Sequence, residues 1–297
     1  MKKPLAGALL TLALLGLGAA PAAATALPAP ASAPAAAPAP ALPSAATPAA
    51  SAAVAVDFAG TVALSNCSGS VVRLPQSQPD DRALVLSNGH CLEGGMPGPG
   101  VVVVDRPSTR SFTLLNSSGR GVATLRAGKI AYATMTDTDV SLYELTSTYR
   151  QIEDRYRVRA LELDTARPAQ GTAVKVVSGY WKRIYSCSVD GFAYRLKEGD
   201  WTWKDSIRYT SACDTIGGTS GSPVIDTATG KVVAVNNTGN EDGGRCTVNN
   251  PCEVDANGTV TVRPGINYAQ QTYTIAPCVG AGNRIDLGRP GCALPKP

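Results

Sequence analysis

The stretch Ser87-Asn88-Gly89-His90-Cys91 contains the only histidine of this 297-residue chain, and the interpretation of fold and function starts from it. Histidine gains and loses a proton near neutral pH, because its unperturbed pKa is about 6.5. A lone histidine is more commonly an ordinary surface or core residue than a catalytic one. Two segments that follow it in the sequence favour a catalytic role here.

The first of these segments is Gly217-Gly218-Thr219-Ser220-Gly221-Ser222-Pro223-Val224. Glycines around Ser220 allow a tight turn that exposes its hydroxyl and lets backbone N–H groups converge in front of it. Serine is a weak nucleophile without a base, and His90 could be that base. Taken alone, the segment could equally be an ordinary turn rich in glycine and serine.

The second segment is Asp139 with the apolar run that follows it, Val140 to Leu145. An acid at the mouth of an apolar strand is costly to bury unless another group pairs with it. A hydrogen bond from a histidine Nδ1–H would pair it, fix the tautomer and stabilise the imidazolium. Asp137 is the competing candidate, and a solvated loop aspartate is the simpler alternative. Asp139 is preferred because it adjoins the apolar run.

The order of the three residues is histidine, acid, serine. An α/β-hydrolase places the serine ahead of the histidine and has glycine where Ser222 stands, whereas a subtilisin-like order needs the acid before His90. The order found here is that of chymotrypsin-type proteases.

Most of the chain after residue 55 reads as short strands separated by Gly, Pro, Asn and Ser clusters. Strands at this spacing, without long helical patterns between them, predict an all-β fold of antiparallel barrels or a sandwich. The charged, less patterned stretch Tyr149 to Leu161 is expected to connect two halves. The expected strands are 58–64, 69–74, 83–87, 101–104, 112–115, 129–133 and 140–145, then 172–178, 183–189, 222–225, 231–236, 259–262 and 266–268.

The N-terminal region predicts export. In residues 1–26, Lys2 and Lys3 precede an apolar run, and small residues suited to cleavage follow, which is typical of a signal peptide. Residues 27–55 are almost only Ala, Pro, Ser and Thr, and we expect a spacer or a pro-segment there. The mature protein is therefore expected to be secreted and extracellular, with no membrane association after signal removal.

Composition narrows the remaining classes. The eight cysteines, an even number in an exported chain, favour disulfides over zinc ligation, and no metal or cofactor is expected. The net charge of +4 includes the two signal lysines, and no basic run is interleaved with aromatics. No nucleic-acid partner is expected from this pattern.

The chain resembles a secreted bacterial member of the chymotrypsin/trypsin-like serine protease family, and its serine motif is close to that of the glutamyl endopeptidase branch. The resemblance implies two six-stranded antiparallel β-barrels with the active site in the cleft between them. Residues 56–150 would carry His90 and Asp139, and residues 151–297 would carry Ser220. The motifs concerned are Cys67-Ser68-Gly69-Ser70, Gly89-His90-Cys91, Asp139-Val140-Ser141-Leu142 and Asp214-Thr215-Ile216-Gly217-Gly218-Thr219-Ser220-Gly221-Ser222-Pro223.

The resemblance also implies a secreted, monomeric serine endopeptidase that acts on polypeptides through an acyl-enzyme intermediate. Ser220 would attack the scissile carbonyl, His90 would take and return the proton, and Asp139 would orient His90. The N–H groups of Gly218 and Ser220 would form the oxyanion hole. Cys67 would pair with Cys91, and proximity favours Cys187 with Cys213, Cys246 with Cys252 and Cys278 with Cys292, although sequence leaves these pairings open.

Specificity is expected to depend on Asp214, Thr215, Val235, Asn236 and Asn237. In trypsin-like members an acid six residues before the serine lies at the base of the primary pocket, so a preference for basic P1 residues is expected from Asp214. Glutamyl endopeptidases would need a histidine near Val235–Asn237, and the only histidine is already used. The alternative is that Asp214 is a structural hydrogen-bonding residue.

Three other functions stay open at this point: a non-catalytic binding module on the same fold, an acyl hydrolase or esterase with the same triad, and a glutamate-specific endopeptidase. Labelling by a serine-directed phosphonate separates the first from the enzymes. Peptide and simple ester substrates separate the other two.

Overall fold

A computed structural model describes residues 54–297 of the chain. The expected signal peptide, residues 1–26, and residues 27–53 of the Ala/Pro-rich segment lie outside the described residues. Within the described part the chain is mostly β, as expected, with one short α-helix and three 3-10 turns. No helix among residues 54–297 is long and apolar enough to cross a membrane.

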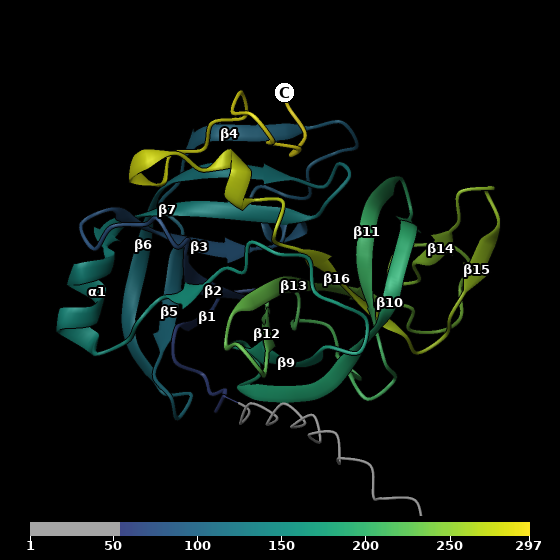
Figure 1. Cartoon of the computed structure of the whole chain (residues 1–297), viewed down its shortest axis with the longest axis horizontal. Coiled ribbons are helices and arrows are strands. Elements are labelled where there is room, and N and C mark those ends of the chain that lie inside the picture. The colour runs from purple at the N-terminus through teal and green to yellow at the C-terminus, as the bar shows by residue number, and fades with distance from the viewer. Residues whose placement is uncertain (1–53) are drawn as a thin grey trace, which may run out of the picture. The chain divides into compact units, whose positions relative to one another are not determined.

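The first half of the described chain forms a closed antiparallel barrel (Figure 1). Six strands pair in the ring β1-β5-β6-β7-β3-β2, and β2 closes the ring by pairing with β1. Two further strands, β4 and β8, pair with β6 and β2 outside the ring. The strands are β1 Thr61–Ala63, β2 Ser68–Arg73, β3 Arg82–Ser87, β4 Val102–Pro107, β5 Ser111–Leu115, β6 Gly121–Thr134, β7 Val140–Thr148 and β8 Leu161–Glu162.

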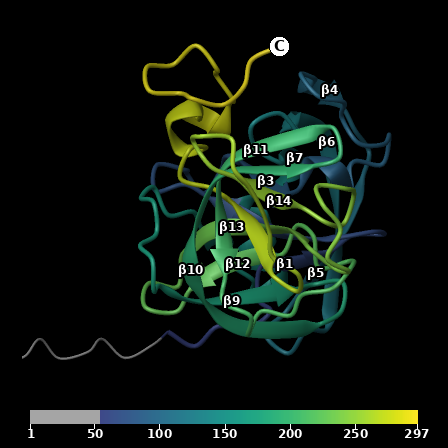
Figure 2. The ribbon, with the colours of Figure 1, turned by 90° about the vertical axis from the view of Figure 1, so that its right-hand side faces the viewer.

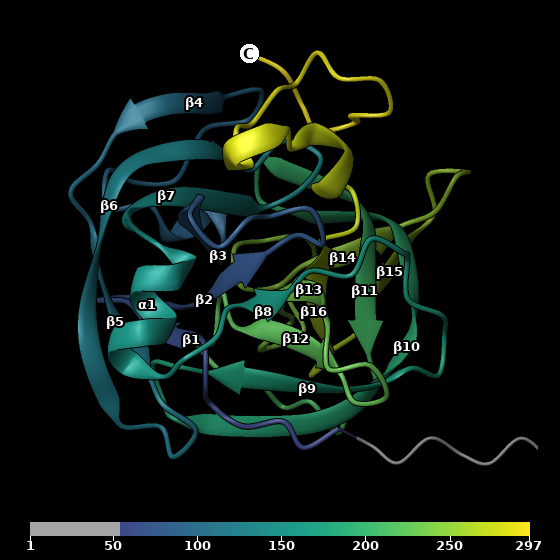
Figure 3. The same cartoon turned by 60° about the vertical axis from the view of Figure 1, so that its left-hand side comes forward.

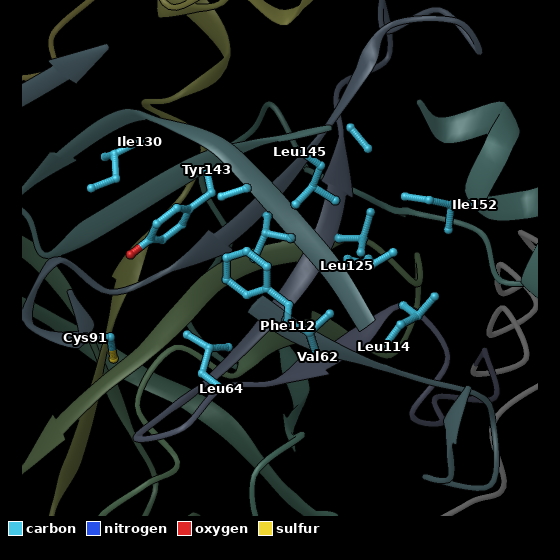
Figure 4. Packing of buried hydrophobic residues seen from close by; sticks show 14 of the residues in the cluster. Val62, Leu64, Cys91, Phe112, Leu114, Leu125, Ile130, Tyr143, Leu145 and Ile152 are labelled. Atoms are coloured by element: carbon cyan, nitrogen blue, oxygen red, sulfur yellow. The ribbon is translucent and has the colours of Figure 1, made fainter. Parts of the chain in front are cut away.

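Alternating side chains of β7 belong to two different cores. Tyr143 and Leu145 lie in the interior of the first barrel (Figure 4). There the rings of Tyr143 and Phe112 pack edge to face, with their centroids 5.2 Å apart. Val140 and Leu142 point the other way, into a second apolar cluster that also contains C-terminal residues. Both faces of the strand are therefore buried, which explains why apolar residues fall on both of its faces.

The second half forms another closed antiparallel ring, β9-β10-β11-β16-β13-β12, which returns to β9. The expected architecture of two six-stranded antiparallel barrels is therefore confirmed. A hairpin of β14 and β15 extends this sheet from β10. The strands are β9 Ala173–Ser178, β10 Arg183–Glu198, β11 Trp201–Tyr209, β12 Pro223–Asp226, β13 Val232–Gly239, β14 Cys252–Val254, β15 Val260–Val262 and β16 Asn267–Gln271.

The β10–β11 hairpin is longer than the sequence suggested and reaches the first barrel. The expected strand ended at residue 189, but β10 continues through an irregularity between Val189 and Gly191. Near the hairpin end, the indole N–H of Trp201 donates to the carbonyl of Pro97 at 2.9 Å, and that of Trp203 donates to the carbonyl of Met135 at 3.0 Å. These contacts hold the hairpin end beside the first barrel.

The expected connection 149–161 begins with a helix, α1 (Tyr149–Tyr156), which lies beside the first barrel (Figure 3). Thr148 and Gln151 form a capping box, in which each side chain bonds the other's backbone N–H. Tyr149 and Ile152 face the barrel core. The Thr-x-x-Gln pattern is a helix start signal that the sequence interpretation missed.

The C-terminal residues lie over the first barrel on the side of β7 (Figures 1 and 2). The Asn283 side chain donates to the Arg82 carbonyl at 2.9 Å, and the Tyr132 hydroxyl donates to the Pro295 carbonyl at 3.0 Å. This segment contains the 3-10 turns η2 (Ala276–Cys278) and η3 (Ala281–Asn283). All eight cysteines are paired as expected: Cys67 with Cys91, Cys187 with Cys213, Cys246 with Cys252, and Cys278 with Cys292.

Candidate active site

His90 lies on the 3-10 turn η1 (Gly89–Cys91), directly after β3. The turn is held by the Cys67–Cys91 disulfide, which ties it to the residue before β2. Gly89 is required sterically, since a Cβ there would clash with the Thr134 carbonyl. Backbone packing and the disulfide therefore fix the position of the His90 backbone, from which the imidazole extends.

Asp139 is fully buried and pairs with His90 through both carboxylate oxygens. Oδ2 lies 2.6 Å from His90 Nδ1, and Oδ1 accepts the His90 backbone N–H at 3.0 Å. Because a carboxylate only accepts, Nδ1 carries the proton and Nε2 is left to act as a base. The Asn88 side chain donates to the backbone carbonyl of Asp139 at 2.7 Å, which holds the backbone of the acid in place. Asp137, the competing candidate, instead pairs with Lys204 at the surface.

The pKa of His90 is raised above 6.5. Burial is the largest influence and acts in the opposite direction, because it disfavours the charged imidazolium. The charge and the hydrogen bond of Asp139, together with the charge of Glu198, outweigh burial. The imidazolium that a general base must form is therefore stabilised at this position.

Ser220 lies in the loop before β12. The residue after it, Gly221, occupies a position in the turn that requires glycine. Gly221 has φ +80°, and a Cβ there would clash with the Ser68 carbonyl. The Ser220 hydroxyl donates to the Asn237 carbonyl at 3.1 Å. Within residues 54–297 it makes no hydrogen bond to His90, although both side chains line one cavity. The hydroxyl must leave the Asn237 carbonyl before it can donate to Nε2.

Two backbone N–H groups beside Ser220 are free. Within the described chain, neither the N–H of Gly218 nor that of Ser220 donates a hydrogen bond, whereas the N–H of Thr219 between them donates to Ile216. Gly218 has φ +86°, a conformation that favours glycine. Unpaired backbone donors next to a nucleophile are suited to binding an oxyanion.

The cavity that contains His90 and Ser220 has a volume of about 90 Å³. Of the expected substrate-binding residues, Thr215, Asn236 and Asn237 line it. Val235 does not, because its side chain is fully buried in the core. Asp214 does not either: it is exposed and lies outside the cavity lining. The structure thus does not place Asp214 at the base of this cavity.

Sequence reasoning missed the β10–β11 contribution to the cavity, which comprises Glu198, Trp201 and Trp203. A signal existed, because residues 201–209 alternate between apolar and polar, except at Asp205, as a half-buried strand does. Nothing local, however, indicates that the hairpin end lies against the first barrel.

One group of potential metal ligands lies within residues 54–297, namely Cys67, His90 and Cys91. Both sulfurs are joined in a disulfide and His90 is paired with Asp139, so this group offers no thiolate to a metal.

Comparison with known proteins gives a family match. A model described as "Trypsin-like peptidase domain" matches residues 67–235, which is more than half of the chain. Among solved structures, the MamO protease domain from Magnetospirillum magneticum is 13% identical, with TM-score 0.46, covering 74% of this chain and 95% of that one. The active form of the Rv3671c protease from M. tuberculosis is 15% identical, with TM-score 0.46, covering 81% and 85%. No curated protein matches the chain.

Proposed function

The chain belongs to the trypsin-like peptidase family and is a serine endopeptidase, and on this premise we propose that His90, Asp139 and Ser220 are its catalytic triad. The observation that carries the assignment is the pair of His90 with a fully buried Asp139, at 2.6 Å, on the same cavity as Ser220. The raised pKa of His90 supports its role as the base.

The proposed reaction follows from these groups. Ser220 Oγ leaves the Asn237 carbonyl, transfers its proton to His90 Nε2 and bonds to the scissile carbonyl carbon. The N–H groups of Gly218 and Ser220 bind the resulting oxyanion, and Asp139 stabilises the imidazolium. His90 then protonates the leaving amine as the C–N bond breaks, which leaves an acyl-enzyme. His90 next deprotonates a water that adds to the ester carbon, and the imidazolium returns its proton to Ser220 Oγ as the Oγ–C bond breaks and the acid is released.

We also propose that the enzyme acts outside the cytoplasm. Four disulfides in one chain are suited to an oxidising compartment. The expected signal segment, the monomeric state and the basic P1 preference stay predictions.

Peptide hydrolysis by matched serine variants tests the proposal. Ser220→Ala should abolish turnover while leaving the thermal unfolding transition unchanged. Ser222→Ala is the control, because it removes a buried hydroxyl that has no hydrogen-bond partner in the described chain and should retain activity. Turnover by folded Ser220→Ala would contradict the assignment. Hydrolysis of simple esters without peptides would point to an esterase, and cleavage after Glu alone would point to the glutamate-specific alternative.

A further inference from the structure

Glu198, at the end of β10, is a buried carboxylate that borders the active-site cavity. Its residue is only 7% exposed. Oε1 accepts the backbone N–H of Asn249 at 2.8 Å, whereas Oε2 is buried without a close hydrogen-bond partner in residues 54–297. Burial raises the pKa of the Glu198 carboxyl, and the nearby Thr238 hydroxyl and the Asn249 N–H act against this rise. A buried acceptor without a partner is costly and uncommon in folded proteins. Beyond its effect on the pKa of His90, the reaction steps described above give this carboxylate no contact with the substrate.

The charged groups around this carboxylate give no internal cation to pair with it. Among the described residues that line the cavity, none is lysine or arginine, and the one other carboxylate is that of Glu241. His90 is the only group there that can become positive, and it is already paired with Asp139. The lining thus carries two acidic side chains and no lysine or arginine.

Two indole rings border the same cavity as Glu198. Trp201 is partly exposed, whereas Trp203 is only 2% exposed and packs within an apolar cluster, so Trp201 is the ring that a ligand can reach. Aromatic faces attract cations and accept the apolar stem of a lysine or arginine side chain. A cavity that holds both a carboxylate and an accessible indole ring is therefore suited to a long cationic side chain. Asp214 is exposed and lies outside this lining.

We infer that Glu198 is the specificity-determining residue of the cavity and takes the lysine or arginine side chain of a peptide substrate bound beside the scissile bond. This inference rests on the proposed function, since it concerns the substrate of the same site. It keeps the expected preference for a basic residue and moves its origin from Asp214 to the β10–β11 hairpin.

A different role for Glu198 would be to act only through the charge of His90. In that case its removal would change turnover of all substrates equally, whatever their charge. A direct contact would instead change the ratio of kcat/KM between basic and neutral substrates. The ratio is therefore the readout that distinguishes the two roles.

The experiment compares wild type, Glu198→Gln and Asp214→Asn on peptide series with Arg, Lys, Gln or Leu at each position around the scissile bond. Glutamine keeps the oxygen that accepts the Asn249 N–H and removes the charge. Loss of a charge-assisted hydrogen bond should reduce the basic-to-neutral ratio roughly 10- to 100-fold in Glu198→Gln. Asp214→Asn is the matched control and should leave the ratio unchanged.

Binding of an arginine-containing peptide and of its glutamine analogue to Ser220→Ala gives a readout that is independent of turnover. The arginine peptide should bind more tightly, and only while Glu198 is present. An unchanged ratio in Glu198→Gln, loss of the preference in Asp214→Asn, or equal binding of the two peptides would overturn the inference. A wild-type protein that fails to cleave any peptide while it still prefers the arginine peptide would instead overturn the proposed function alone.

Discussion

Asp139→Asn should remove most of the turnover while leaving the fold intact. The asparagine oxygen can still accept the His90 backbone N–H, which Oδ1 now accepts at 3.0 Å. The amide NH₂ would then face Nδ1, where Oδ2 now lies at 2.6 Å. Since position 139 is fully buried, no water can relieve the clash of two donors there, so Nδ1 must give up its proton to accept this donor and Nε2 becomes protonated. A protonated Nε2 cannot take the proton of Ser220.

The magnitude follows from two losses. Moving the proton back to Nδ1 would place the Nδ1–H against the asparagine NH₂, and two buried donors facing each other cost about 1–3 kcal/mol. The variant also loses the charge-assisted hydrogen bond from the imidazolium to the carboxylate, which contributes roughly 1.5–3 kcal/mol. Together, roughly 3–6 kcal/mol corresponds to a fall in kcat of about 10²- to 10⁴-fold.

The assay is kcat for a peptide substrate above pH 7, with far- and near-ultraviolet circular dichroism to confirm folding. Asp137→Asn is the matched control, because Asp137 is paired with Lys204 at the surface and should change kcat less than twofold. Retention of more than a tenth of the activity in folded Asp139→Asn would refute the assigned role. So would an equal loss in Asp137→Asn.

Three further predictions concern the groups around the triad. The kcat/KM of wild type should rise with pH through a midpoint above 6.5, because the pKa of His90 is raised. Glu198→Gln should move this midpoint to lower pH, since the variant lacks an anion that raises the pKa of His90. A midpoint shifted to higher pH would contradict the effect assigned to Glu198. Gly221→Ala should lower the free energy of unfolding by about 2–5 kcal/mol in urea titration, since φ is +80° and no space exists for a Cβ; an unchanged midpoint would contradict the steric argument. Replacing Cys67 and Cys91 by alanine should lower the free energy of unfolding, measured by urea titration, by about 3.5 kcal/mol, because the disulfide closes a loop with a sequence separation of 24 residues. An equally stable variant would show that the disulfide does not hold the η1 turn.

The sequence predicted the parts of this site that depend on residue type and order. The prediction of His90, Asp139 and Ser220 as a triad depends on local chemistry. They are a lone base, an acid beside an apolar strand and a serine among glycines, and each can be recognised from its neighbours in the sequence. The structure brings the first two into contact and places the third on the same cavity. Only the resemblance supplied the idea that a cleft lies between two barrels.

The missed features depend on long-range geometry. Gly191 reads as the end of a strand, but β10 passes it with a change of register and carries Glu198 to the cavity. The sequence offset that suggested Asp214 as a pocket acid does not specify where its side chain points, and the residue is exposed. Such placements follow from how a hairpin crosses between barrels, which no local pattern determines.

The most direct test of the central claim is to identify the residue that a serine-directed phosphonate modifies in the mature, folded protein. Mass spectrometry of the digested adduct should place it on the Ser220 peptide, with no adduct in Ser220→Ala and much slower modification in His90→Ala. A folded protein that cleaves peptides but carries the adduct on another residue, or carries none, would contradict the account.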